Sequence, residues 1–139
     1  MKSATAAPRM SGSGGSGKVA LGKKVPAFSS LVTGGGSWHS SEAAGKNVVI
    51  YFYPRDNTPG CTVEGEAFRD LAPAFKKANT LILGVSPDSI ASHEKFKTKY
   101  RFAFELLSDE EQTLCRLFDV FKEKSMYGRK FMGVERSTF

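Results

Sequence analysis

One segment limits the possible folds of this chain more than any other. A near-continuous apolar run, Asn47 to Tyr53, ends at Pro54, and a short turn then leads to Cys61. An apolar run of this length is typical of a strand that is buried on both faces, as in a sheet covered by helices on each side. After Cys61 the apolar residues recur every three or four positions, which predicts a helix. The thiol therefore lies between a buried strand and the start of a helix.

A cysteine in the first turn of a helix lies beside unpaired backbone amides and the positive end of the helix dipole, and both favour an anion. The thiolate is the nucleophilic form of cysteine, so this position predicts a reactive Cys61. The alternative is an ordinary core cysteine in a βαβ domain.

The elements around this segment complete an α/β pattern. A second buried strand is expected at Thr80 to Ser86, and with the helix after Cys61 it predicts a βαβ unit with a right-handed parallel crossover. Pro73 lies inside that helix and is expected to kink it. The predicted apolar stripe of the helix consists of Phe68, Leu71, Phe75 and Ala78.

Before this unit, Ala27–Thr33 and Ser37–Ser40 flank three glycines and predict a β-hairpin. After it, Asp88 and Ser89 are expected to cap a helix that runs to about Lys99, with Phe96 and Tyr100 on one face.

The C-terminal third is expected to begin with a short strand at Glu105–Leu107. Ser108 and Glu111 fit a capping box for the next helix, whose apolar residues are Leu114, Leu117, Phe118 and Phe121. Strands are then expected at Phe131–Val134 and within Glu135–Phe139.

Composition narrows the class of protein. The 139 residues predict one domain at 18–139 after a flexible Ser/Gly-rich tail at 1–17. Half of the net charge of +6 comes from the first eighteen residues, and the rest is spread among acids, so charge does not indicate a nucleic-acid partner. No apolar stretch is long enough for a membrane span, and the N-terminus lacks a secretory signal. Two cysteines form neither a disulfide framework nor a zinc site, which favours a cytoplasmic protein and leaves an organelle open.

The residues around the thiol carry a family resemblance. Pro54, Thr58 and Cys61 reproduce the proline–threonine–cysteine spacing of peroxiredoxins, and Thr58–Thr62 resembles the peroxiredoxin Q or bacterioferritin comigratory protein group. The resemblance continues in order through Leu83–Ser89, Leu107–Asp109, Met126–Gly128 and Glu135–Phe139. It implies a thioredoxin-like fold of the peroxiredoxin type, with a central mixed sheet flanked by helices.

The resemblance also implies an activity, thiol-dependent reduction of hydrogen peroxide and organic hydroperoxides without a cofactor or a metal. Cys61 would be the peroxidatic cysteine, which cycles through a sulfenic acid. Thr58 and Arg136 would bind the peroxide beside the sulfur, Pro54 would cover the thiol, and the amides of Gly60 and Cys61 would complete the pocket.

Each supporting residue also has a simpler interpretation. Pro54 can merely end a strand, Thr58 can be a helix cap, and Arg136 can be a surface arginine. Glu64 is expected either to hold Arg136 or only to suit the helix dipole.

The second half of the reaction cycle departs from the family pattern. Many relatives carry a resolving cysteine five residues after the peroxidatic one, where this chain has Glu66, and others carry it in the next helix, where this chain has Phe96–Thr98. Cys115 is the only other thiol, and a core role is favoured over a resolving role. We therefore expect a one-cysteine mechanism with glutathione, glutaredoxin or thioredoxin as the reductant, and the family resemblance implies a monomer. His39 and His93 are both expected to be exposed and not catalytic.

Two other functions stay open. A thioredoxin-type disulfide oxidoreductase would need a C-x-x-C motif, which is absent at Cys61. A redox-responsive binding module or holdase would be oxidised once and then expose apolar surface. Relatives usually continue past Phe139 with another strand and a helix, so these elements are expected to be absent here and apolar surface to be exposed.

Overall fold

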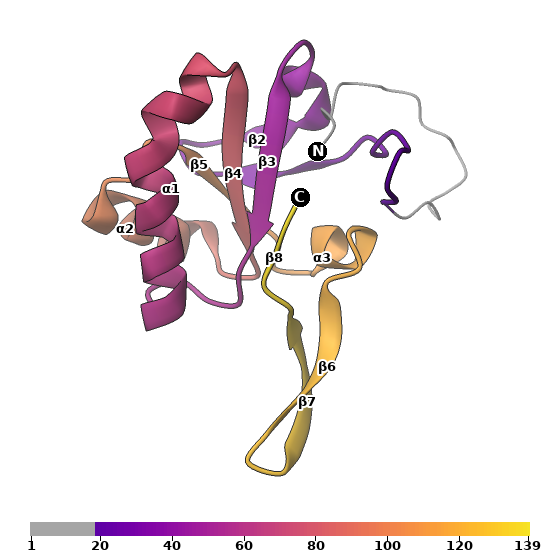
Figure 1. Ribbon diagram of the computed structural model, residues 1–139. Coiled ribbons are helices and arrows are strands. Elements are labelled where there is room, and N and C mark those ends of the chain that lie inside the picture. The colour runs from indigo at the N-terminus through magenta and orange to yellow at the C-terminus, as the bar shows by residue number, and fades with distance from the viewer. Residues whose placement is uncertain (1–18) are drawn as a thin grey trace.

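The described chain is organised around a six-stranded mixed sheet with the strand order β2-β1-β5-β4-β3-β8 (Figure 1). This computed structural model describes residues 19–139, so the predicted tail at 1–17 lies outside the described residues. The central strands β3, β4 and β5 are parallel, while β1 and β8 are antiparallel to their neighbours. The six strands are β1 (Ser29–Val32), β2 (Ser37–His39), β3 (Asn47–Phe52), β4 (Thr80–Ser86), β5 (Glu105–Ser108) and β8 (Ser137–Thr138).

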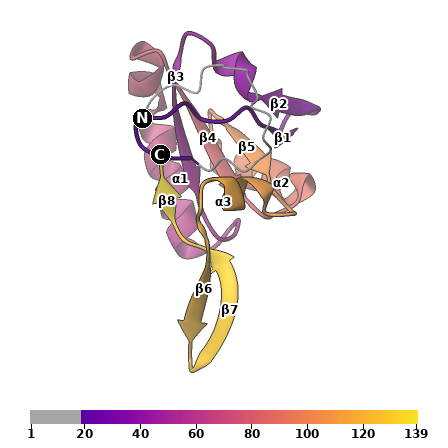
Figure 2. The same ribbon diagram turned by 90° about the vertical axis from the view of Figure 1, so that its right-hand side faces the viewer.

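Helices cover both faces of the sheet. The helical elements are η1 (Ser40–Ala43), α1 (Pro59–Lys77), α2 (Ile90–Tyr100) and α3 (Thr113–Leu117). α1 and α2 pack on one face, and α3 lies on the other (Figures 1 and 2).

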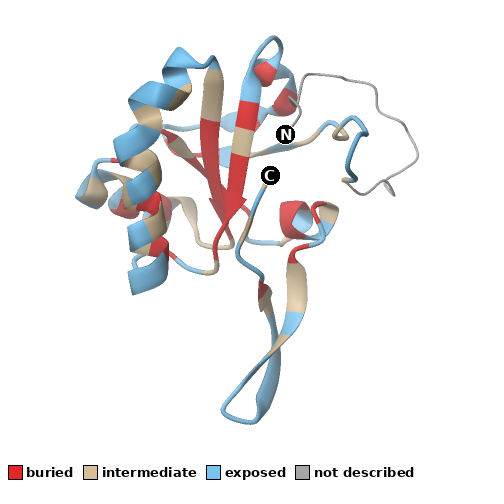
Figure 3. Ribbon diagram, in the orientation of Figure 1, coloured by how far each residue is buried: buried red, intermediate tan, exposed pale blue. Residues whose placement is uncertain are grey.

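Alternation along β3 separates the core into two parts. Ile50 and Phe52 belong to the cluster that contains Cys115, whereas Tyr51 and Tyr53 belong to the cluster that contains Cys61. Successive side chains of a strand point to opposite faces, so the sheet lies between the two thiols. Burial is concentrated in the central strands and in the helix faces that meet them (Figure 3).

A two-stranded hairpin of β6 (Phe121–Met126) and β7 (Arg129–Val134) extends away from the sheet (Figures 1 and 2). The chain then returns, and β8 pairs with β3 at the edge of the sheet. Phe139 exchanges backbone hydrogen bonds with Ile50 and packs its ring against Phe118 at a centroid distance of 5.0 Å. The return from the hairpin brings the segment between β7 and β8 to the carboxyl end of β3.

Most predicted elements are confirmed, including the N-terminal hairpin, the parallel β3-α1-β4 unit and the side-chain cap of α2 by Ser89. The predicted stripe of α1 is wrong in part, because Leu71 and Ala78 are exposed. Phe68, Ala72 and Phe75 pack against the core instead. Their spacing of four and three residues places them on one face, and Leu71 lies beside that face.

The predicted capping box is wrong. The Ser108 hydroxyl donates to the Asp88 carbonyl oxygen at 2.6 Å, and the Asp109 carboxylate accepts from the amides of Leu114 and Cys115, each at 2.9 Å. The Asp109 carboxylate satisfies two helix amides at once, so Asp109 caps the helix in place of Ser108, the predicted capping residue. The helix is also shorter than expected, because it ends at Leu117 and Phe121 begins β6.

Among residues 19–139, no helix combines the length and the apolar character that a membrane span requires.

Candidate active site

Cys61 is the third residue of α1, and its side chain lies in the core beneath the start of that helix. Thr58 is the N-cap residue with an extended backbone, and Pro59 occupies the first helical position. The first hydrogen bond of the helix runs from the Thr62 amide to the Thr58 carbonyl at 2.8 Å. The amides of Gly60 and Cys61 therefore precede the helical ladder and contribute to the positive end of α1.

Arg136 reaches this thiol from the segment between β7 and β8. Its Nη2 atom lies 3.2 Å from the Cys61 sulfur although the two residues are 75 positions apart. Its Nη1 atom donates to Glu64 Oε1, one turn further along α1. A methyl group added at Gly60 would lie 3.3 Å from Nη2, so the glycine leaves room for the guanidinium group. The predicted approach of Arg136 to the sulfur, and of Glu64 to Arg136, is present in the structure.

The charges at this end of α1 support one another. Burial alone would lower the pKa of Arg136, but the hydrogen bonds and charges of Cys61 and Glu64 raise it. Burial raises the pKa of Glu64, and the hydrogen bond and charge of Arg136 offset part of that rise. Arg136 is therefore a permanent cation beside the sulfur, and it favours the thiolate over the neutral thiol.

The turn before α1 holds Pro54 and Thr58, which are both partly buried. The Thr58 hydroxyl donates to the Arg55 carbonyl at 2.9 Å, and Asn57 between them has a left-handed backbone with a φ of 61°. The Thr58 side chain makes no capping hydrogen bond to α1. Thr58 is therefore the N-cap residue by position, as its simpler interpretation predicts, but its side chain caps no helix amide and its oxygen retains the capacity to accept a further hydrogen bond.

Cys115 has a different environment. It is fully buried in the cluster on the other face of the sheet, and its amide donates to the Asp109 carboxylate. Burial first, and then Asp109, raise the pKa of the Cys115 thiol. Cys115 therefore stays a neutral thiol, packed as a small apolar side chain.

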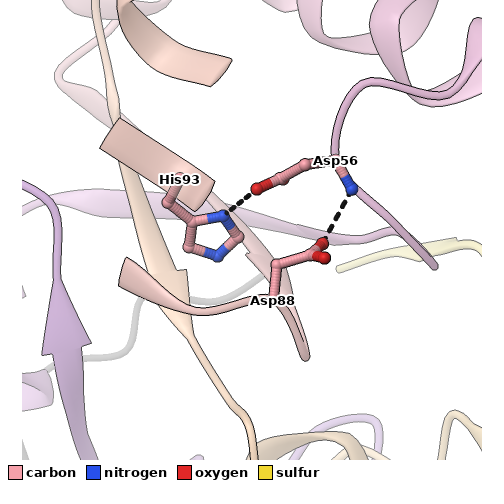
Figure 4. Close-up of side chains that lie close together, drawn as sticks. All are labelled: Asp56, Asp88 and His93. Carbon is pink, nitrogen blue, oxygen red and sulfur yellow. Dashed lines mark hydrogen bonds and ion pairs between the residues drawn. The ribbon is translucent and has the colours of Figure 1, made fainter. Parts of the chain in front are cut away.

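The sequence analysis missed a buried polar network next to the turn (Figure 4). The expected exposure of His93 is wrong, because its side chain is fully buried, while His39 is exposed as predicted. His93 Nδ1 lies 2.7 Å from Asp56 Oδ2, and Nε2 lies 2.9 Å from the Leu107 carbonyl. The position of His93 three residues before Phe96 on α2 was the available signal, because residues three apart share a helix face.

The side chains of Asp56, Asp88 and His93 also form the one group among the described residues whose ligand atoms lie close enough together to hold a metal ion. Their hydrogen bonds favour a different interpretation. Both ring nitrogens of His93 already face protein oxygen atoms, and Asp88 Oδ2 accepts from the Asp56 amide at 2.7 Å. A metal would have to displace these bonds, so the arrangement fits a hydrogen-bond network better than a metal centre.

Comparison with known proteins agrees with this fold and site. Residues 21–139 match the model of the AhpC/TSA family. Peroxiredoxin Bcp of Xanthomonas campestris pv. campestris is 59% identical over 96 residues, which cover 69% of this chain and 60% of that protein. Peroxiredoxin Bcp of Bacillus subtilis is 45% identical over 121 residues, which cover 87% of this chain and 77% of that protein.

A solved structure of the bacterioferritin comigratory protein of Xanthomonas campestris has a TM-score of 0.76 and 52% identity, and the match covers 81% of this chain and 71% of that one. That structure is a trapped intermediate/ligand complex described for the alkyl peroxide reduction activity of that protein. The fold of this chain is thus the thioredoxin-like fold of the peroxiredoxins. The chain belongs to the AhpC/TSA family, within which its relatives are peroxiredoxins of the Bcp and Q group.

Proposed function

We propose that this protein is a thiol-dependent peroxidase that reduces hydrogen peroxide and organic hydroperoxides through Cys61. The observation that supports it most is the Arg136 guanidinium group at 3.2 Å from a sulfur atom at the start of a helix. The alkyl peroxide reduction described for the Xanthomonas campestris relative supports the same class of substrate.

In the first step, the Cys61 thiolate attacks one peroxide oxygen. A sulfur–oxygen bond forms, the oxygen–oxygen bond breaks, and the sulfur is oxidised by two electrons to a sulfenic acid. The other oxygen takes both electrons of the broken bond and a proton, and it leaves as water or an alcohol. Negative charge therefore develops on the leaving oxygen, and fast reaction requires hydrogen-bond donors aimed at that position.

The residues around Cys61 can supply those donors. Arg136 has further guanidinium hydrogens besides the one directed at the sulfur, and the amides of Gly60 and Cys61 lie at the positive end of α1. The Thr58 hydroxyl would accept a hydrogen bond from the peroxide O–H group, or donate one to a peroxide oxygen in place of its bond to Arg55. Partly buried Pro54 would keep water from the pocket and so strengthen these interactions.

For the second half of the cycle we propose a one-cysteine mechanism. The cluster that holds Cys115 lies across the sheet from the cluster that holds Cys61. A disulfide needs Cα atoms within about 7 Å, so Cys115 cannot reach the sulfenic acid without extensive unfolding. An external thiol would form a mixed disulfide with Cys61 and release water. A second reductant thiol would then attack the sulfur of the first, so that a disulfide forms between the two reductant thiols and Cys61 is released as a thiol.

The reductant in this proposal is glutathione, glutaredoxin or thioredoxin, the protein acts as a monomer, and its location is the cytoplasm. The cytoplasm is a reducing compartment and maintains the pool of thiols that the second half of the cycle consumes. This requirement supports the cytoplasmic location.

The test is peptide mass mapping after one equivalent of hydrogen peroxide at neutral pH, with a sulfenic-acid trap present. The proposal predicts rapid trapping at Cys61 while Cys115 stays reduced. A disulfide between the two cysteines would make Cys115 the resolving residue and overturn the one-cysteine mechanism. Absence of any preferential reaction at Cys61 would overturn the peroxidase proposal.

Turnover separates the peroxidase from a redox-responsive holdase. With glutathione, glutaredoxin or thioredoxin present, the peroxidase consumes many equivalents of hydrogen peroxide for each protein molecule. A holdase would consume one equivalent and then bind unfolded client protein. The variant Cys61→Ser controls for peroxide that is consumed by the reductants alone.

A further inference from the structure

The buried carboxylate of Asp56 is held by an unusual number of side chains. It accepts hydrogen bonds from the Tyr53 hydroxyl at 2.6 Å and the Ser92 hydroxyl at 2.7 Å, and His93 Nδ1 lies 2.7 Å from it. Asp56 is only 7% exposed and His93 is fully buried. These partners fix the orientation of the buried carboxylate, because Tyr53 and His93 are themselves fully buried.

The proton arrangement at His93 explains why a histidine fits this position. The Leu107 carbonyl can only accept, so Nε2 at 2.9 Å from it carries a hydrogen. If Nδ1 also carries a hydrogen, it donates to an ionised Asp56. If that proton lies on Asp56 instead, the protonated carboxyl group donates to Nδ1. Every hydrogen bond of the pair is satisfied in both arrangements. The pair has no net charge in either arrangement, which lowers the cost of burying it.

Asp56 lies in the turn that precedes the reactive cysteine. The backbone of the same residue is fixed as well, since its amide donates to Asp88 Oδ2 at 2.7 Å (Figure 4). Two residues later, Thr58 closes the turn through its bond to the Arg55 carbonyl and begins α1. The orientation of Asp56 therefore determines where Thr58 and the first turn of α1 lie.

Most of the side chains that bond to Asp56 and to the neighbouring Asn57 come from α2. Ser92 and His93 lie in the first turn of α2, and Tyr100 at its end donates to Asn57 Oδ1 at 3.2 Å. The turn is thus attached to α2 at Asp56 and at Asn57. The helix is itself held on the sheet by Phe96 and Tyr100, which pack in the core cluster of Cys61. A shift of this helix would move the turn, and the turn carries the groups that are aimed at the peroxide.

We propose that His93 is a positioning residue for the chemistry of Cys61: through Asp56 it fixes the turn of residues 55–58, and with it Thr58 and the helix start that carries the thiol. This inference rests on the proposed peroxidase function. His93 does not touch the substrate in this scheme. It acts only through Asp56, so its two hydrogen bonds have separable consequences.

Two amide variants separate those bonds. The side-chain nitrogen of asparagine corresponds to Nδ1 and can still donate to Asp56, whereas that of glutamine corresponds to Nε2 and can still donate to the Leu107 carbonyl. His93→Asn therefore keeps the link to the turn and loses the link to β5, and His93→Gln does the reverse. Both variants bury one amide at the same place, so each controls for the packing change in the other.

The readout is the rate of Cys61 oxidation by hydrogen peroxide compared with its rate of alkylation by iodoacetamide. The alkylation rate depends on the fraction of Cys61 that is present as thiolate and on its accessibility. The rate of reaction with peroxide depends on both of these and also on hydrogen-bond donors aligned with the leaving oxygen. We expect His93→Gln to lose at least about 10-fold in the peroxide rate with little change in alkylation, because small misplacements of reacting groups are costly. His93→Asn should stay much closer to wild type. Equal rates in the two variants, whether fast or slow, would overturn the proposal.

Hydrogen exchange of the amides at 55–58 tests the positioning itself. The amides should exchange faster in His93→Gln than in His93→Asn. Equal exchange rates in the two variants would contradict the positioning role. This test does not depend on whether the protein is a peroxidase. A wild-type Cys61 that is inert to peroxide would instead overturn the function proposed above. The two failures are therefore distinguishable.

A milder change covers the case in which the histidine variants do not fold. Ser92→Ala removes one hydroxyl bonded to Asp56, and Ser30→Ala removes a hydroxyl bonded to the backbone carbonyls of Leu31 and Ser108 and not to Asp56. Ser92→Ala should lower the ratio of peroxide to alkylation rates, and Ser30→Ala should leave it unchanged. An unchanged ratio in Ser92→Ala would then count against the proposal.

Discussion

The two cysteines of this chain share several features, yet their environments differ in charge. Both are buried, with 2% of Cys61 and none of Cys115 exposed, and both lie within the first turn of a helix. At Cys61 the neighbouring charge is the Arg136 cation. At Cys115 it is the Asp109 carboxylate, which already accepts from the two amides at that helix start.

Neither burial nor a helix start distinguishes the two thiols, so the difference in reactivity that we propose rests on the charges beside them. A helix N-terminus stabilises one anion well, and at α3 that anion is Asp109. A thiolate at Cys115 would lie beside a second negative charge in an apolar core, so the thiol keeps its proton. Within the described part of the chain, no carboxylate accepts from the first amides of α1, and Arg136 lies against the sulfur. The anion that the start of α1 stabilises can therefore be the Cys61 thiolate.

The largest expected effect separates the two thiols directly. Cys61→Ser should lower peroxide reduction by at least about 10⁴-fold, because a serine hydroxyl at this position cannot act as the nucleophile. Cys115→Ser should stay close to the wild-type rate. Peroxide consumption with a regenerating thiol measures both. A comparable loss in Cys115→Ser would mean that the second thiol takes part in the cycle.

The next effect concerns the cation. Arg136→Met keeps much of the side-chain volume and removes the charge, and we expect the rate of Cys61 oxidation to fall by about 10²–10³-fold, the range for losing one oriented donor at a developing anion. Arg116→Met is the matched control, since Arg116 is the cation near Cys115. Stopped-flow oxidation by hydrogen peroxide measures both. Equal rates in the two variants would remove Arg136 from the chemistry.

Much of this contrast could be predicted from the sequence. The apolar runs of β3 and β4 gave the parallel unit, and the spacing of Pro54, Thr58 and Cys61 led to Arg136 through the family resemblance. These features are local patterns or motif positions. The position of the sheet between the two thiols was not predicted, because the alternation along β3 does not say which face α3 packs against.

The missed features depend on partners that are distant in sequence. The sequence pattern predicts that His93 lies on the exposed part of its helix, yet its partners Asp56 and Leu107 come from a turn and a strand. Asp109 was overlooked because Ser108 and Glu111 fit a capping pattern equally well. Burial of a polar side chain is decided by whether the fold brings it a partner, and spacing within one helix does not contain that information.

The anion at α3 can be removed to test its role there. Asp109→Ala leaves two buried amides without their acceptor, and we expect it to lower the free energy of unfolding by about 2 kcal/mol. The rate of Cys61 oxidation should be unchanged. Urea unfolding at neutral pH measures the loss, and Asp70→Ala, which removes an exposed acid paired with Arg69, should cost less than about 1 kcal/mol. Similar losses in the two variants would mean that Asp109 does not cap α3.

The smallest effect is a pH dependence that arises from Cys115. Burial and Asp109 raise the pKa of this thiol in the folded protein, whereas in the unfolded chain it titrates near its ordinary value of about 8.5. Above that pH the unfolded chain releases a proton that the folded protein retains, so the contribution of Cys115 to stability is present below about pH 8.5 and is lost as the pH rises.

Between pH 7 and 9.5 the wild type should therefore lose about 1.4 kcal/mol more stability than Cys115→Ser, which has no thiol to titrate there. All other titratable groups are the same in the two proteins, so their contributions cancel in the difference. Urea unfolding at a series of pH values measures it. Parallel curves for the two proteins would mean that Cys115 ionises as readily in the fold as out of it. The difference in charge between the two thiol environments would then not explain which of them reacts.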